Sequence, residues 1–81
     1  MDPITPGSTG AAVEDIQERL VRLDYVIDDS EREKNTYGPS TAKAVARFRL
    51  DHDLSLGEDV DTATWMLLVD ESYQLGDRTL Y

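Results

Sequence analysis

The sequence contains no cysteine, which excludes disulfide bonds, thiol catalysis and cysteine-ligated zinc at once. It contains a single histidine, His52, so a metal site built on paired histidines cannot form from these residues. No apolar run of about 18 residues occurs, so no segment is expected to span a membrane. Basic residues are also scarce, with 8 lysines and arginines against 17 acidic residues and a formal net charge of -9. This balance argues against binding to nucleic-acid phosphates or to an anionic membrane surface, because both need clustered positive charge.

A length of 81 residues is typical of one small domain, and an apolar fraction of 40% is enough for a modest core. The acidic excess is uneven, since residues 1–50 carry a net charge of -2 and residues 51–81 a net charge of -7. A solvated acidic face that keeps a small domain soluble is the simpler interpretation. The other interpretation is that the acidic third docks a cationic partner.

Residues 1–10 are rich in proline and glycine and are expected to form a turn region before the first helix. In residues 11–23 the apolar side chains recur three and four positions apart, which predicts a helix with one buried stripe. Residues 26–36 are polar and without period. We expect a loop there, either irregular throughout or with one helical turn at residues 30–34.

Two further helices are expected after this loop. Gly38 and Pro39 form a start signal for the second helix, which should run to about His52. Asp61 is placed to cap a third helix over residues 62–70. The pattern therefore predicts an all-α fold, a small three-helix bundle. Its core is expected to contain Val13, Ile16, Leu20, Leu23, Tyr25, Val45, Phe48, Leu54, Val60, Trp65 and Leu68.

No arrangement typical of catalysis is present. His52 stands alone, and a lone histidine near a helix end is more often a cap or a surface residue than a catalytic base. The acidic stretch 51–62 fails as an EF-hand calcium loop, because Leu56 and Thr62 stand where glycine and glutamate are needed. Neither a phosphate-binding loop nor a dinucleotide fingerprint occurs. We therefore predict no catalytic residue, no metal ligand and no cofactor.

The order and spacing of residues across the chain are more specific than any single motif. Residues 7–25 follow G-x-x-G-x-x-V-x-x-I-Q-x-x-L-x-x-L-x-Y, and residues 37–48 follow Y-G-P-x-T-x-x-A-V-x-x-F. The pattern is completed by Leu54, Gly57, Val60, Asp61, Thr64, Trp65 and Leu68. Over about residues 5–69 this pattern resembles the type 1 peptidoglycan-binding domain, a three-helix, peptidoglycan-binding-like module of bacterial cell-wall hydrolases.

The resemblance implies a non-catalytic module that binds peptidoglycan and targets a cell-wall hydrolase, an N-acetylmuramoyl-L-alanine amidase, to its substrate. Its expected partners are peptidoglycan or muropeptides and adjacent domains of the same chain, and the module itself is expected to be a monomer. Residues 71–81 would form a linker toward a second repeat, with a turn at 75–77 followed by an extended stretch. The resemblance places the domain in the cell wall or outside the cell if the parent protein is exported. No signal peptide is seen in these residues, which leaves the cytoplasm open.

A few positions depart from the pattern of this family. Asp24 and Asp53 stand where glycine is common, and aspartate tolerates the turn conformations that such positions need. Arg49 stands where the family usually has a second glutamine, which changes the polar chemistry of the second helix. The acidic segment 27–36 is also longer than the usual loop.

The resemblance and the side-chain chemistry suggest ligand contacts at Gln17, Tyr37, Arg47 and Arg49. A tyrosine ring can stack on a sugar, and an arginine can pair with a stem-peptide carboxylate. The alternative for Gln17 and Tyr37 is packing or hydrogen bonding between helices, and for the arginines it is a solvated face. With Lys43, the two arginines make the second helix a local basic strip, so a carboxylate-bearing wall peptide is expected there.

A competing hypothesis is an interaction or regulatory module that has kept the fold without wall binding. It draws on the net charge of -9 and on Arg49 in place of glutamine. Because peptidoglycan itself carries carboxylates, an acidic surface gains nothing electrostatically by binding it. A salt-sensitive complex with a protein partner, together with absent wall binding, would favour this hypothesis.

Overall fold

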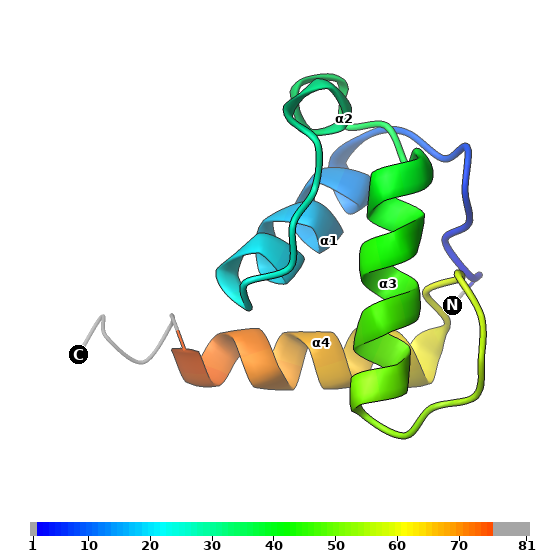
Figure 1. Ribbon diagram of the computed structural model, residues 1–81, viewed down its shortest axis with the longest axis vertical. Helices are drawn as coiled ribbons and strands as arrows, with labels where there is room; N and C mark the ends of the chain where they lie inside the picture. The colour runs from blue at the N-terminus through cyan, green and yellow to red at the C-terminus, as the bar shows by residue number, and fades with distance from the viewer. Residues whose placement is uncertain (1, 76–81) are drawn as a thin grey trace.

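The computed structural model describes residues 2–75, and these form four helices (Figure 1). They are α1 (Ala11–Arg22), α2 (Asp29–Lys34), α3 (Pro39–Asp51) and α4 (Thr62–Leu75). The described residues contain no strand, only isolated backbone bridges that join Ile4 to Val60 and Thr9 to Thr36. The expected all-α fold is confirmed. The three expected helices are α1, α3 and α4, and the additional short helix α2 matches the alternative of one helical turn at residues 30–34.

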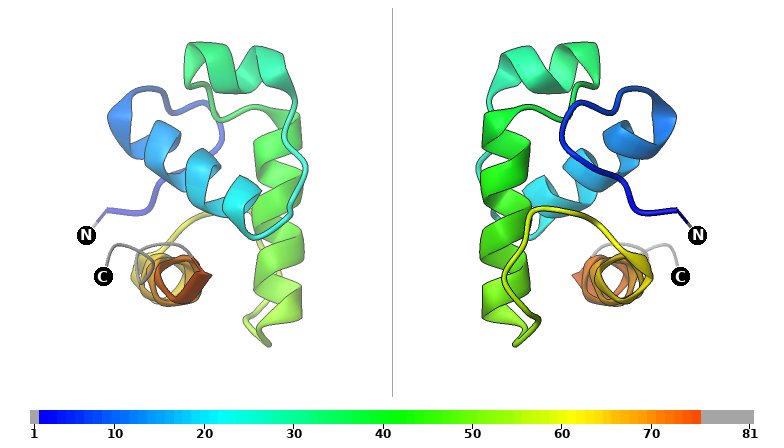
Figure 2. Two further views of the ribbon diagram at one scale, coloured as in Figure 1. Left: turned by 90° about the vertical axis from the view of Figure 1, so that its left-hand side faces the viewer. Right: turned by 90° about the vertical axis from the view of Figure 1, so that its right-hand side faces the viewer.

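The helices surround one small core. Helix α1 packs against both α3 and α4. Helix α4 passes crosswise beside the C-terminal half of α3, while α2 lies near the opposite end, close to where α3 begins (Figures 1 and 2). The connection from α1 to α2 runs alongside α3 (Figure 2).

Helices α1 and α3 begin and end close to where the sequence predicts. Gly10 precedes α1 with a φ of 109°, a conformation that residues with side chains rarely adopt. Pro39 is the first residue of α3, where its missing N–H leaves no hydrogen bond unmade. Asp24 and Asp53, which follow these helices, have φ values of 73° and 60°. They adopt the left-handed turn conformation that aspartate was expected to tolerate in place of glycine.

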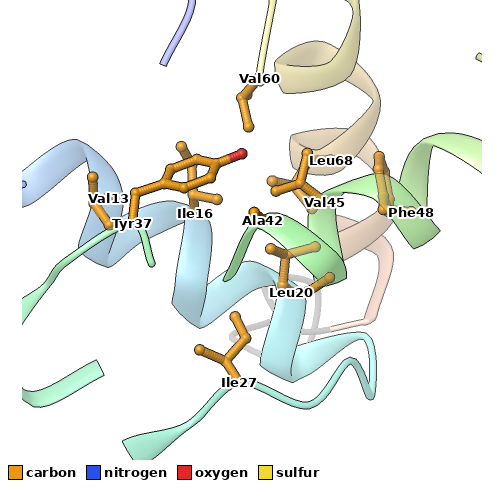
Figure 3. Packing of buried hydrophobic residues seen from close by; sticks show 11 residues of the cluster. Val13, Ile16, Leu20, Ile27, Tyr37, Ala42, Val45, Phe48, Val60 and Leu68 are labelled. Carbon is orange, nitrogen blue, oxygen red and sulfur yellow. The ribbon is translucent and has the colours of Figure 1, made fainter. Parts of the chain in front are cut away.

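The core is filled mainly by aliphatic side chains around Tyr37 and Phe48 (Figure 3). Its buried apolar members are Val13, Ile16, Leu20, Ile27, Tyr37, Ala42, Ala44, Val45, Phe48, Val60 and Leu68. Several expected core residues are only partly buried, namely Leu23, Tyr25, Leu54 and Trp65. Ile27 and Tyr37 occupy the interior from either side of α2. The polar segment between α1 and α3 is therefore anchored in the core at both ends, which the polar sequence of its middle did not indicate.

Helix α4 continues beyond Asp70, where the sequence predicted its end. The linker toward a second repeat stays a prediction, because the turn at 75–77 and the extended stretch after it fall almost wholly on residues 76–81, which lie outside the described residues. Ser72 lies in this continuation, where it is completely buried and its hydroxyl donates to the carbonyl oxygen of Leu68 at 2.7 Å. The same hydroxyl accepts a hydrogen bond from Arg19 Nη1 at 2.7 Å. A polar residue thus continues the buried face of α4 and ties it to α1.

The N-terminal segment fastens the beginnings of α3 and α4 to each other. Ile4 and Val60 exchange two backbone hydrogen bonds, with N–O distances of 3.0 and 2.8 Å. Farther along, the N–H of Gly7 donates to the carbonyl of Tyr37 at 2.8 Å, and the N–H of Tyr37 donates to the carbonyl of Ser8 at 2.9 Å. The expected turn region is therefore also a tie across the fold.

Candidate functional site

The side chain of Gln17 is an internal donor at the N-terminus of α3. It is 2% exposed, and its Nε2 donates to the carbonyl oxygen of Thr36 at 2.9 Å and to Thr41 Oγ1 at 3.0 Å. These bonds tie α1 to the turn that opens α3. Hydrogen bonding between helices, the alternative considered for Gln17, is what the structure shows.

Glu31, on α2, caps the N-terminus of α3. Its carboxylate accepts hydrogen bonds from the backbone N–H groups of Gly38 at 3.1 Å, Ser40 at 2.9 Å and Thr41 at 2.9 Å, and from the Thr41 hydroxyl at 2.8 Å. Burial alone would raise the pKa of Glu31, but the hydrogen bonds from Ser40 and Thr41 outweigh it and lower the pKa to about 2. A β-carbon at Gly38 would lie 2.7 Å from Glu31 Cδ, so only glycine lets the carboxylate come this close. The short helix α2 therefore serves to place a negative charge at the positive end of α3.

Tyr37 lies in the core and not on the surface. It is 1% exposed, its ring lies among the buried side chains shown in Figure 3, and its hydroxyl donates to the carbonyl oxygen of Glu58. Burial raises the pKa of Tyr37, and the nearby charges of Asp59 and Glu58 raise it further. Packing between helices, the alternative considered for Tyr37, is what the structure shows, and no ring face is presented to a sugar.

Arg49 is also internal, because it is only 7% exposed. Its Nε donates to the carbonyl oxygen of Ser55 at 3.0 Å, and its Nη1 donates to the carbonyl oxygen of Asp59 at 3.1 Å and to Thr64 Oγ1 at 2.6 Å. The guanidinium thus holds the connection between α3 and α4 against α3. Arg49 is therefore not part of the solvated face that was the alternative considered for it.

Asp61 caps α4 as the sequence predicts. Its Oδ1 accepts hydrogen bonds from the hydroxyl of Thr64 at 2.6 Å and from the N–H of Thr64 at 2.9 Å. These hydrogen bonds, with a smaller contribution from the positive charge of Arg49 3.4 Å away, hold the pKa of Asp61 below its usual range.

Arg47 is the candidate residue that the structure leaves exposed, and it lines a surface groove beside α3. This α3 groove has a volume of about 530 Å³ and is lined by Tyr25, Val26, Asp28, Pro39, Ser40, Lys43, Ala44 and Arg47. Residues of the connection from α1 to α2 line one wall, and residues of α3 line the other. Figure 2 shows this connection running alongside α3. Since Arg49 is buried, Lys43 and Arg47 are what remains of the basic strip expected on this helix.

One end of the α3 groove is fixed by Asp51. Arg47 Nε lies 3.1 Å from Asp51 Oδ1, and the Tyr25 hydroxyl donates to Asp51 Oδ2 at 2.7 Å. The Tyr25 ring also meets Phe48 edge-on, with the centroids 6.0 Å apart and the planes at 70°. Partial burial and then the bond to Asp51 raise the pKa of Tyr25 from its ordinary value of 10 to about 12. Tyr25 is thus a fixed wall, whereas the Arg47 side chain remains 70% exposed.

A second exposed surface, the α4 face, is formed by Trp65, Met66, Val69, Asp70 and Tyr73 around a depression of about 470 Å³. It is mostly apolar, and Met66 and Tyr73 are 65% and 44% exposed. The guanidinium of Arg19 lies 5.6 Å from the centroid of the Trp65 ring, so one cation already stacks there.

Residues 9–68 match the sequence model of a family described as "Putative peptidoglycan binding domain". The chain belongs to this peptidoglycan-binding domain family. The matched residues include every residue that lines the α3 groove. No curated protein and no solved structure matched the chain.

Membership confirms the resemblance seen in the sequence and indicates binding to peptidoglycan in the context of the cell wall. The family is one of binding domains and not of catalytic ones. Within residues 2–75, no helix combines the length and the apolar character needed to cross a membrane. The same residues contain no group of three or more histidine, cysteine, aspartate or glutamate side chains that could hold a metal ion.

Sequence reasoning missed the wall of the α3 groove that precedes α2. Val26 and Asp28 line this wall, and both lie in the segment expected to be a solvated loop. The apolar pair Val26-Ile27 was a signal, because Ile27 anchors the segment in the core and leaves Val26 86% exposed beside α3. Gly38 was the signal for a different missed contact, since a glycine directly before a helix can mark the close approach of another group, here the carboxylate of Glu31.

Proposed function

We propose that this peptidoglycan-binding domain binds its polymer at the α3 groove. The observation that supports this is the pair of exposed cations, Lys43 and Arg47, beside an open groove large enough for a small ligand. The other three candidate residues support the site only indirectly, because their polar atoms make hydrogen bonds inside the fold. These residues are Gln17, Tyr37 and Arg49.

The domain then acts by tethering a cell-wall hydrolase to its substrate. Binding one part of a protein to an insoluble polymer raises the effective concentration of every other part at that polymer. Even a weak contact at an open groove is therefore useful to an attached enzyme. The resemblance to modules of N-acetylmuramoyl-L-alanine amidases makes such an amidase the enzyme that we propose.

Depletion from solution by insoluble peptidoglycan tests this function. We expect the 81-residue chain to be depleted at low salt, and the double variant Lys43→Ala, Arg47→Ala to stay in solution. The matched control is Arg32→Ala, Lys34→Ala, which removes the same charge from exposed positions on α2. Absent depletion of the unaltered chain, or equal loss in the two double variants, would contradict the proposal.

The α4 face favours a second candidate function, a protein-interaction module that kept the fold without wall binding. Met66 and Tyr73 expose apolar surface there, and Asp70 lies among them. This candidate gains support if insoluble peptidoglycan leaves the chain in solution. It loses support if the chain is depleted and the double variant Met66→Lys, Tyr73→Lys forms the same complexes as the unaltered chain.

A further inference from the structure

The cations of the α3 groove are placed to act together on one anionic ligand. Lys43 and Arg47 are four residues apart on α3, so their side chains lie on the same face of the helix, one turn apart. Among residues 2–75, Lys43 has no ion-pair partner within 4 Å, and Arg47 engages one carboxylate through Nε. Since a guanidinium has five donors, Arg47 can hold a second carboxylate while it keeps Asp51.

The other positive feature nearby, the N-terminus of α3, is closed to a ligand. Glu31 accepts from the N–H groups of Gly38, Ser40 and Thr41, which are the ones that would otherwise face an anion. Its own negative charge also repels a second carboxylate at that point. An anionic ligand is therefore directed along the groove toward Lys43 and Arg47.

The opposite wall of the α3 groove has the chemistry of a peptide partner. Asp28 is exposed there and can receive an amine, and the exposed side chain of Val26 can receive small apolar side chains. Neutral sugar rings bind best to the face of an aromatic ring. The one ring in this groove belongs to Tyr25, which is half-buried against Phe48 and whose hydroxyl already donates to Asp51.

We infer that the α3 groove takes the peptide part of peptidoglycan and not its glycan. The ligand is a short peptide whose free carboxylates pair with Lys43 and Arg47, while a free amine on the same peptide pairs with Asp28. This inference rests on the proposed function, because it names the part of the polymer that the same groove binds.

An NMR titration of the whole chain with two soluble fragments tests the inference. One fragment is a stem peptide with free carboxylates and a free amine, and the other is a β-1,4-linked N-acetylglucosamine oligosaccharide without peptide. We expect the peptide alone to shift the amide signals of residues 25–28 and 40–47, with an affinity that falls as salt is raised. Lys43→Glu should weaken this binding about tenfold or more, because it replaces a charge-assisted contact by repulsion. Lys34→Glu makes the same charge change on α2 and should leave the affinity unchanged.

The outcomes separate the inference from the proposed function. If insoluble peptidoglycan depletes the chain while only the oligosaccharide shifts these signals, the domain binds the wall and the peptide inference is wrong. Shifts confined to the α4 face would overturn it in the same way. If the two glutamate variants weaken peptide binding equally, the attraction is a general charge effect and not a site at Lys43. If insoluble peptidoglycan does not deplete the chain at all, the proposed function is wrong, and the inference that rests on it is wrong as well.

Discussion

At the N-terminus of α3, the amide of Gln17 donates to Thr41 Oγ1 at 3.0 Å, and at the N-terminus of α4, the guanidinium of Arg49 donates to Thr64 Oγ1 at 2.6 Å. Each threonine is the third residue of its helix, and each donates in turn to a carboxylate. The donor comes from α1 in the first case and from α3 in the second. We call these two helix starts the α3 junction and the α4 junction. At each of them, a buried polar side chain from an earlier helix holds the first turn of a later helix.

The carboxylates are what distinguish the two junctions. Asp61 directly precedes α4 and caps it locally, whereas Glu31 reaches the start of α3 from a separate helix. The α4 junction pairs its carboxylate with the positive charge of Arg49, whereas the α3 junction pairs Glu31 with the neutral amide of Gln17 through a shared threonine. A local cap leaves the preceding connection free in length. The remote cap of α3 is carried by α2, which lies in the long acidic segment before α3.

The largest effect that we expect from disturbing either junction is at Arg49. Arg49→Ala removes a buried guanidinium and leaves the carbonyl groups of Ser55 and Asp59 without that donor. Hydrogen bonds to a charged group contribute about 1.5–3 kcal/mol each, and Arg49 makes several at once, so the free energy of unfolding should fall by about 3 kcal/mol or more. Denaturant titration followed by circular dichroism measures it.

Two variants calibrate this prediction. Arg49→Gln replaces the guanidinium at the α4 junction by an amide, the same group that Gln17 supplies at the α3 junction. This variant should lose clearly less stability than Arg49→Ala. Arg47→Ala removes an exposed arginine from the same helix and should change the free energy of unfolding by about 0.5 kcal/mol or less. Equal losses in the two alanine variants would mean that Arg49 does not hold the junction.

The second largest effect is expected at Glu31. Glu31→Gln keeps the shape of the side chain but removes the negative charge that accepts from Ser40 and Thr41. Losing these charge-assisted bonds should lower the free energy of unfolding by about 2 kcal/mol. Glu33→Gln, at an exposed position on the same helix, is the matched control. If both glutamine variants unfold at the same denaturant concentration, α2 does not cap α3.

The same carboxylate predicts a dependence of stability on acid. The pKa of Glu31 is about 2 in the folded protein against an ordinary value of 4.5, so its ionised form is favoured by folding. This contribution is complete above about pH 4.5 and is lost as the pH falls from there toward 2. Glu31→Gln should therefore flatten the plot of melting temperature against pH in this range. Asp61, whose pKa is also lowered, should preserve the remaining slope. A slope as steep as that of the unaltered chain would contradict the assignment.

Much of the fold follows from local signals in the sequence. The spacing of Val13, Ile16 and Leu20 indicates α1 because only a helix brings such residues to one face. Asp61 could be predicted as a cap because it lies next to the helix that it caps. The left-handed turns at Asp24 and Asp53 likewise depend on a residue and its immediate neighbours.

The missed features depend on contacts between residues far apart in the chain. Glu31 looks like one acidic residue among many until α2 is folded over the start of α3. Ser72 looks like the beginning of a polar tail, although Arg19 from α1 gives its buried hydroxyl a partner. The burial of Tyr37 and Arg49 was missed for the same reason, since a polar atom on a side chain does not reveal whether its partner is a ligand or the protein's own backbone.

The smallest loss of stability is expected at Thr41, and its comparison with Thr64 separates the two junctions most directly. Thr41 and Thr64 are both fully buried, and valine keeps their shape while it removes the hydroxyl. Thr64→Val leaves one bond of the charged Arg49 unmade, whereas Thr41→Val leaves one bond of the neutral Gln17 unmade. Because hydrogen bonds to charged groups contribute more, we expect a loss of about 2 kcal/mol for Thr64→Val and about 1 kcal/mol for Thr41→Val. The two losses should become equal in an Arg49→Gln background, where both donors are amides. If Thr41→Val remains the milder change there, the difference lies in the carboxylates and not in the donors.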